Sequence, residues 1–148
     1  ADATLSEITT AFTEIENASG VKTTTMRPPY GAIDSSVWLA SQGTMSASVI
    51  WNMDSLDWKR PGVDTIVSNS TEGIQSGYII LMHDGGGNRD QDLEALPKII
   101  DKLHEEGYTF VTVSDLMKSD PDIPSDVASC NAPMPEDAVW PTELSSEA

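Results

Sequence analysis

The chain has 148 residues, of which 39% are hydrophobic, and a formal net charge of −16 at pH 7. This length allows one domain, and the apolar fraction is large enough for a core, which argues against global disorder. A surface this acidic repels phosphate backbones, so we expect no binding to nucleic acid. No apolar stretch approaches the ~20 residues of a membrane span, and the first residues lack the basic and apolar regions of a signal peptide.

Several segments before residue 118 have apolar residues at helical spacing. They predict helices over 3–18, 34–40, 63–74 and 90–106. Asp34 is expected to cap the second helix, and Ser114 to cap a last short one. The helix over 90–106 is expected to have one apolar side, formed by Leu93, Leu96, Ile99, Ile100 and Leu103.

Short runs rich in apolar and β-branched residues lie between these helices, at 22–26, 46–51, 77–82 and 109–113. The run 77–82 is continuously apolar, which is typical of a strand buried on both faces. The alternation of strands and helices predicts an α/β fold with a parallel sheet and helices outside it. In such folds the functional residues lie on loops at the carboxyl ends of the strands.

After residue 118 these patterns end. Residues 119–148 contain several prolines and many acidic residues, no lysine or arginine, and no apolar period. We expect them to form an acidic, disordered tail, in which only Trp140 could dock. Residues 1–118 are then the folded part of the chain.

Three loops at strand ends carry the residues that could do chemistry. The segment RPPYG contains Arg27 and Tyr30, DSLDW contains Asp57 and Trp58, and HDGGG begins with His83. An aspartate can hold a histidine and keep it protonated, and an arginine can hold an anion, so these residues predict acid/base chemistry. Two plainer interpretations stay open: a histidine at a strand end is often structural, and an arginine before two prolines often makes only a loop ion pair.

Taken in order, the three loops resemble motifs of the polysaccharide deacetylases of carbohydrate esterase family 4, the NodB-homology domain. RPPYG resembles that family's third motif, DSLDW its fourth and ILMHDGGG its fifth. The resemblance covers residues 1–118, as the C-terminal half of the domain. It implies part of a distorted (β/α) barrel, with parallel strands and outer helices.

The resemblance implies a metal-dependent hydrolase that removes acetyl groups from N-acetylated, or O-acetylated, polysaccharide. Members of the family use a divalent metal, usually zinc, to activate the water that attacks the acetyl carbonyl. Peptidoglycan, chitin and xylan all stay open as substrates. Such substrates imply an extracellular or cell-surface location.

The resemblance also assigns roles to individual residues. His83 would protonate the leaving amine, and Asp57 would orient His83 and keep it protonated. Arg27 would pair with the aspartate that acts as general base, and the backbone N–H of Tyr30 would help to bind the oxyanion.

Two hydrophobic residues would contact the substrate by the same resemblance. Trp58 would form a wall of the sugar groove, and Leu81 would line the slot for the acetyl methyl group. Both belong to the motifs quoted above, the fourth and the fifth.

The family's first two motifs, which supply the base and the metal ligands, do not occur before the arginine loop. The only two histidines, His83 and His104, cannot supply the roughly three protein ligands that zinc needs. We therefore expect no metal site in this chain and no activity without the N-terminal half of the same domain. The chain would be a shortened form, a proteolytic product or one piece of a split protein. The alternative is a non-catalytic, carbohydrate-binding or scaffold fragment derived from such an enzyme.

Overall fold

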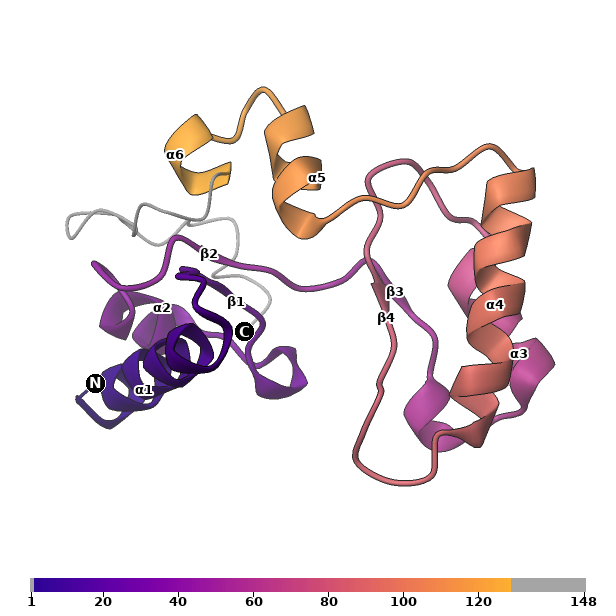
Figure 1. Ribbon diagram of the computed structural model, residues 1–148, viewed down its shortest axis with the longest axis horizontal. Coiled ribbons are helices and arrows are strands. Elements are labelled where there is room, and N and C mark those ends of the chain that lie inside the picture. The colour runs from indigo at the N-terminus through magenta and orange to yellow at the C-terminus, as the bar shows by residue number, and fades with distance from the viewer. Residues whose placement is uncertain (1, 129–148) are drawn as a thin grey trace. The chain divides into compact units, whose positions relative to one another are not determined.

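The computed structural model of the protein describes residues 2–128, without the side chains at 126 and 128, and Figure 1 shows their path. The chain divides into two compact units, one formed by Ala1–Ile50 with Thr112–Ala148 and the other by Trp51–Val111. Among the described residues each unit contains a pair of parallel strands. No helix within residues 2–128 is long and apolar enough to cross a membrane.

The first unit is built on a pair of short strands. Strands β1 (Thr25–Met26) and β2 (Ala47–Ser48) are parallel, with Thr25 opposite Ala47 and Met26 opposite Ser48. The described helices of this unit are α1 (Asp2–Ser19), α2 (Ser35–Ala40), α5 (Val113–Ser119) and α6 (Ser125–Ala128). The prediction of a helix over 3–18 is confirmed by α1.

Two helices of the first unit begin at side-chain caps. Asp34 caps α2, as predicted, because its Oδ1 accepts a hydrogen bond from the backbone N–H of Val37 at 2.9 Å. Thr112 caps α5, and its hydroxyl oxygen accepts the backbone N–H of Asp115 at 3.1 Å. The prediction of Ser114 as this cap was wrong, because Ser114 already lies inside the helix.

Apolar contacts in the first unit extend past residue 118. Met117 of α5 is buried and packs against Ala47, Val113 and Ile123. Ile123 belongs to the segment expected to form a tail, and within that segment the structure describes turns and the helix α6. The rest of the expected tail, residues 129–148 with Trp140, lies outside the described residues.

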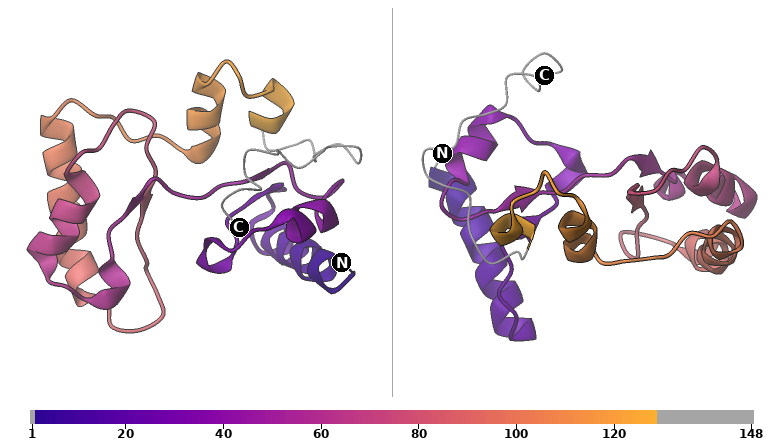
Figure 2. Two further views of the ribbon diagram at one scale, coloured as in Figure 1. Left: turned by 180° about the vertical axis from the view of Figure 1, so that it is seen from behind. Right: turned by 90° about the horizontal axis from the view of Figure 1, so that it is seen from above.

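The second unit pairs strands β3 (Met53–Asp54) and β4 (Ile80–Leu81) with helices α3 (Val63–Thr71) and α4 (Asp90–Glu105). The strands are parallel, with Met53 opposite Ile80 and Asp54 opposite Leu81. The two helices lie side by side in both views of Figure 2, where α3 is magenta and α4 is salmon. The predicted helices over 63–74 and 90–106 are thus confirmed, although α3 ends three residues earlier than expected.

The core of the second unit lies between α3 and α4. Its buried residues are at most 2% exposed: Ile66, Ala95, Ile99 and Leu103. Partly buried residues from the strands and from other positions surround them: Val63, Val67, Ile74, Ile80, Met82 and Tyr108. This packing explains why α4 is a long regular helix, since one face of it is removed from water.

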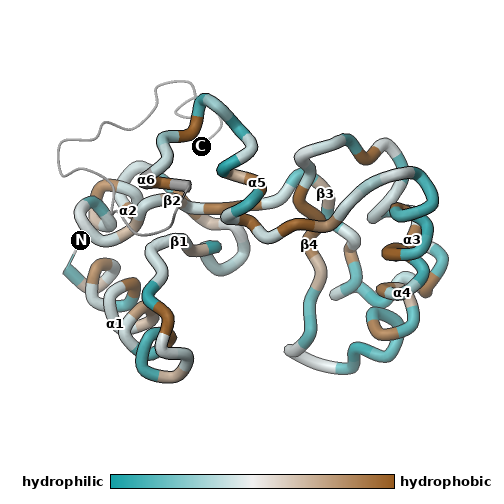
Figure 3. The backbone as a smooth tube through the Cα atoms, turned by 45° about the horizontal axis from the view of Figure 1, so that its top comes forward, coloured by the Kyte–Doolittle hydropathy of each residue, from teal (hydrophilic) through white to brown (hydrophobic). Residues whose placement is uncertain are grey.

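The apolar face of α4 differs from the predicted one. Leu93 is 75% exposed and Leu96 is 44% exposed, so the prediction that both lie on the buried side was wrong. The buried stripe instead runs through Asp92, Ala95, Ile99 and Leu103. Ile99 and Leu103 were therefore predicted correctly, and Asp92 and Ala95 take the places expected for Leu93 and Leu96. Figure 3 shows this mixture of hydrophobic and hydrophilic positions along α4.

The strands are shorter than the sequence predicts. Each of the first three predicted runs contains a strand of two residues, and β3 lies in a segment that was predicted to be a loop. Residues 109–113 form no strand, and Phe110 and Val111 are 51% and 58% exposed, so the prediction of a buried strand there was wrong. A strand needs a neighbour for its backbone hydrogen bonds, and no described strand pairs with this segment.

Ile99→Ala should lower the free energy of unfolding of the second unit by about 2–4 kcal/mol, because it leaves a cavity in the core. Leu93→Ala is the matched control: it removes as many carbon atoms from the same helix at an exposed position, and should cost less than ~0.5 kcal/mol. Urea denaturation followed by circular dichroism measures both changes. Equal effects of the two substitutions would contradict the assignment of the buried face.

Candidate active site

The pairing of β3 with β4 brings two loops together. Because the strands are parallel and in register, the chain leaves both at the same edge, after Asp54 and after Leu81. The first exit leads into a 3-10 turn at Asp57–Lys59, and the second leads directly to His83. Two of the predicted catalytic residues therefore meet at the carboxyl ends of neighbouring strands.

The Asp57 carboxylate contacts both the backbone and the ring of His83. The carboxylate has no exposed surface, and its Oδ2 accepts the backbone N–H of His83 at 2.6 Å. Its Oδ1 lies 2.7 Å from the ring Nδ1 of His83 and accepts the backbone N–H of Trp58 at 2.8 Å. These contacts fix both the position of His83 and the rotation of its imidazole.

The His83 ring is arranged to exchange a proton through one nitrogen. A carboxylate can only accept hydrogen bonds, so the Nδ1 facing Asp57 is the nitrogen that carries a proton in this contact. That leaves Nε2 as the ring nitrogen that can act on a substrate, and 37% of the side chain is exposed. A partly exposed imidazole with a fixed carboxylate behind it is suited to general acid or base chemistry.

The turn that carries Asp57 is held in an unusual backbone conformation. Leu56 and Arg60, on either side of the turn, have φ angles of 55° and 54°. Residues other than glycine rarely adopt this left-handed region. Buried Ser55 supports the turn: its hydroxyl accepts the N–H of Asp57 at 3.3 Å, and its carbonyl accepts from the Asn69 side chain at 3.1 Å. The surrounding hydrogen bonds thus stabilise a conformation that the local chain would not choose.

The same turn is fastened to the first turn of α4. Arg60 Nη2 lies 2.9 Å and 3.2 Å from the two carboxylate oxygens of Asp90. The side-chain oxygen of Gln91 accepts the backbone N–H of Gly62 at 2.9 Å. The start of α4 therefore holds the Asp57 turn in place.

Arg89 and Asp92 form a further charged pair here, which the sequence analysis missed. Arg89 Nη1 lies 3.5 Å from Asp92 Oδ2, a charge–charge contact that is longer than a well-formed hydrogen bond. Asp92 is 5% exposed, and neither of its carboxylate oxygens has a hydrogen-bond partner among the described residues. Burial raises the pKa of Asp92 and the charge of Asp57 raises it further, whereas Arg89 and His83 lower it. Its place at the head of the stripe Ala95, Ile99 and Leu103 is the signal that could have identified it.

The two predicted substrate contacts lie in the same unit as the acid pair. Trp58 is 53% exposed, and the Lys59 ammonium lies 4.9 Å from the centre of its ring. Leu81 is 8% exposed and lies opposite Asp54 in the strand pair. The exposed indole of Trp58 is available for contact with a ligand, while Leu81 is part of the strand that leads to His83.

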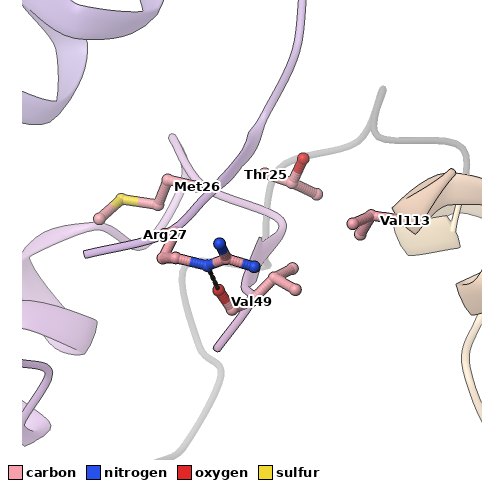
Figure 4. Close-up of a pocket in the computed structure, with 5 residues that line it drawn as sticks. All are labelled: Thr25, Met26, Arg27, Val49 and Val113. Carbon is pink, nitrogen blue, oxygen red and sulfur yellow. Dashed lines mark hydrogen bonds between the residues drawn. The ribbon is translucent and has the colours of Figure 1, made fainter. Parts of the chain in front are cut away.

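Arg27 and Tyr30 belong to the first unit, whereas His83 belongs to the second. Arg27 donates from Nε to the Val49 carbonyl at 3.2 Å, and it borders a cavity of about 240 Å³ that is also lined by Thr25, Met26, Val49 and Val113 (Figure 4). Tyr30 is 99% exposed and has a φ angle of 59°. Its backbone thus adopts the left-handed conformation in the short turn Pro29–Gly31.

The described residues do not fit a zinc site. Within residues 2–128 no group of three His, Cys, Asp or Glu side chains could hold a metal ion. The ring of His83 is bound to Asp57, and His104 packs edge-on against Phe110 with 5.2 Å between the ring centres. A zinc site needs about three protein ligands, and the candidate site described above offers none of the necessary clusters.

The sequence is similar to those of several proteins named deacetylases, although no protein-family model matches the chain. A peptidoglycan-N-acetylglucosamine deacetylase of Bacillus cereus is 42% identical over 94 residues, a match that covers 62% of this chain and 44% of that protein. Further relatives are named chitooligosaccharide deacetylase and bifunctional xylanase/xylan deacetylase. The chain spans less than half the length of each of these relatives.

Solved structures give the same result for the fold. A family 4 carbohydrate esterase from Streptomyces lividans matches with a TM-score of 0.70 and 27% identity, over 90% of this chain and 62% of that one. A pseudoenzyme of the same esterase family from Bacillus anthracis matches with a TM-score of 0.70 and 29% identity, over 78% of this chain and 40% of that one. These likenesses confirm the predicted fold class, part of a (β/α) barrel with parallel strands and helices.

Asp92→Asn should stabilise the protein at neutral pH. In the folded protein the pKa of Asp92 is raised above its usual 3.8. The wild-type protein therefore loses stability relative to the variant as the pH rises through this raised pKa. Below about pH 3.8 the carboxyl group is protonated in both the folded and the unfolded chain, and the difference in stability vanishes. Thermal unfolding from pH 3 to pH 8 measures the difference. Asp115→Asn is a control of opposite sign, because the Thr112 hydroxyl and Lys118 lower the pKa of Asp115. A loss of stability in Asp92→Asn at neutral pH would contradict the expected effect.

Proposed function

We propose that this chain belongs to the polysaccharide deacetylases of carbohydrate esterase family 4, carries part of their domain and supplies the general-acid half of their active site. The observation that carries this proposal is the Asp57–His83 pair, in which a buried carboxylate fixes both the backbone and the ring of a partly exposed histidine. The activity of the complete protein is part of the proposal, since the chain spans only 44% of the Bacillus cereus relative.

The proposed reaction is the hydrolysis of an N-acetyl group. A water oxygen bonds to the acetyl carbonyl carbon, the bond from that carbon to the sugar nitrogen then breaks, and acetate and a free amine are released. An amine leaves as an anion only at high cost, so its nitrogen must receive a proton as the bond breaks. His83 donates this proton from Nε2, and the Asp57 carboxylate favours the protonated ring before the transfer.

The other predicted residues have further roles in the proposed reaction. The backbone N–H of Tyr30 contributes to binding the oxyanion, and Arg27 pairs with the carboxylate of the general base. Trp58 forms a wall of the sugar groove, for which its 53% exposure leaves a free indole face. Leu81 lines the slot for the acetyl methyl group.

The general base and the divalent metal belong, in this proposal, to the N-terminal half of the same domain. Residues 2–128 offer no group of three metal-ligating side chains, so no step above uses a metal bound by this chain. Zinc held by the other half would polarise the acetyl carbonyl and lower the pKa of a bound water. The N-terminal half is therefore the partner that we propose for this chain.

We propose peptidoglycan as the first substrate to test. The relative that is 42% identical is named for the removal of acetyl groups from peptidoglycan N-acetylglucosamine. Chitin-type and xylan-type substrates are the other arms of the same assay. A cell-wall substrate requires the protein to act outside the cell membrane, at the cell surface or in the extracellular space.

A second candidate function is a non-catalytic, carbohydrate-binding or scaffold role. Its support is the structural likeness to a pseudoenzyme of this esterase family and the exposed Trp58, which could bind sugar without turnover. A binding role does not require the fixed geometry of an acid, because sugar stacking on Trp58 needs no fixed imidazole. The geometry of His83 and Asp57 therefore favours the catalytic proposal.

The chain alone should release no acetate from N-acetylglucosamine oligomers and should bind no stoichiometric zinc. The same chain joined to the N-terminal half of the Bacillus cereus relative should bind about one zinc ion per molecule and release acetate. Acetate assays and metal analysis on both proteins give the comparison. Acetate release by the pure chain would refute the half-site proposal, and a zinc-loaded but inactive fusion would favour the scaffold role.

In the joined protein, His83→Ala should lower kcat by roughly 100-fold to 10,000-fold and leave the zinc content unchanged, which is the effect of losing a positioned acid. Asp57→Asn should have a smaller effect and move the alkaline limb of the pH–rate profile to lower pH, because the charge that favours the imidazolium is gone. His104→Ala is the control and should keep kcat near wild type. A near-normal kcat with full zinc after His83→Ala would remove the acid assignment.

A further inference from the structure

Two charged residues at the start of α4 have no part in the reaction described so far. We propose that Arg89 and Asp92 form a positioning pair for His83: Arg89 fastens the loop that follows His83, and Asp92 cancels the positive charge that Arg89 brings to that loop. Asp57 then acts on His83 without opposition from a nearby cation. The inference rests on the proposed role of His83 as an acid, but its test measures the protonation of His83 and not turnover.

Arg89 is bound to the backbone of the His83 loop. Its Nε donates to the Gly85 carbonyl at 2.8 Å, and its Nη2 donates to the Gly86 carbonyl at 3.4 Å. Only 13% of the Arg89 side chain is exposed, so water screens its charge less than that of a surface arginine. A poorly screened cation on this loop opposes the protonation of the imidazole that the loop carries.

Asp92 is placed to compensate for that cation. Its Oδ2 lies 3.5 Å from Arg89 Nη1, and 7% of its side chain is exposed. Neither oxygen has a hydrogen-bond partner among the described residues, so a helix cap or a core hydrogen bond does not account for a carboxyl group here. A buried carboxylate is unfavourable unless an opposite charge is near it, and Arg89 is that charge.

Asp92 is connected to the His83 loop through Arg89: its Oδ2 lies 3.5 Å from the guanidinium that binds the Gly85 and Gly86 carbonyls. The charged groups that act on Asp92 come from three different segments: Asp57 from the turn after β3, His83 from the end of β4 and Arg89 from the start of α4. Coupling between two titrating groups is reciprocal, so the charge of Asp92 must also act on the His83 imidazole. Its sign favours the protonated ring, which is the form that a general acid needs.

A purely structural role for Asp92 predicts something different. An acidic residue in the first turn of a helix is favourable for the helix dipole, whatever its neighbours are. In that case its removal affects the stability of α4 and leaves the protonation of His83 unchanged. The two roles therefore differ in one measurable quantity, the midpoint of the His83 titration.

The experiment follows the His83 ring signals of the full 148-residue chain by NMR as the pH is varied, with the His104 signals identified by His104→Gln. Asp92→Asn should lower the midpoint of the His83 titration by about 0.5 pH unit. In an Arg89→Gln background the same substitution should have a smaller effect, because Arg89 no longer lowers the pKa of Asp92 and the carboxyl group is then less ionised. Glu94→Gln is the matched control, since it removes an exposed carboxylate two residues further along the same helix and should leave the midpoint unchanged.

An unchanged midpoint in folded Asp92→Asn would overturn the proposal, and so would equal shifts in the two backgrounds. If Asp92→Asn does not fold, the wild-type protein provides the test through the carboxyl carbon signal of Asp92. A second inflection of this signal at the midpoint of the His83 titration supports the proposed coupling. A single inflection, with no response to the protonation of His83, rejects it.

Discussion

The contact between Asp57 and His83 is the interaction on which the rest of the second unit depends. A carboxylate with no exposed surface is unfavourable unless its oxygens accept hydrogen bonds. The three donors come from the turn after β3 and from the end of β4, so the parallel pairing of these strands is a condition for burying Asp57. The positive φ angles of Leu56 and Arg60 are a further consequence, because the turn must direct the carboxylate inward over a short distance.

Two ion pairs lie near this contact, and their side chains differ in how far they are exposed to water. Arg60 and Asp90 meet in a largely exposed ion pair, which contributes mainly to the position of the turn. Arg89 and Asp92 meet where both side chains are nearly buried, so their charges act on the neighbouring groups with little screening. A single helix start therefore provides both a mechanical connection and an electrostatic environment for the imidazole.

Much of this arrangement could be predicted from the sequence, and the failures have physical causes. The motifs around Asp57 and His83 predict an acid/base pair, and the helices of the second unit follow from apolar spacing. Ile99 and Leu103 of the buried face of α4 were predicted correctly. Leu93 and Leu96 were placed on it wrongly because they are more hydrophobic than Ala95, whereas burial follows the geometry of packing against α3. Asp92 could not be identified by hydrophobicity at all, since it is an acidic residue on a buried stripe. The apolar run 109–113 lacks the neighbouring strand that would make it a strand.

The residues from His83 to Asp92 have a consequence for how such a site is inherited. The acid, the glycine loop that follows it and the pair Arg89 and Asp92 all lie within ten consecutive positions of the chain. Recombination that exchanges this short stretch would carry the donor and most of its charge environment together, and would leave only the carboxylate of Asp57 to be matched by the recipient.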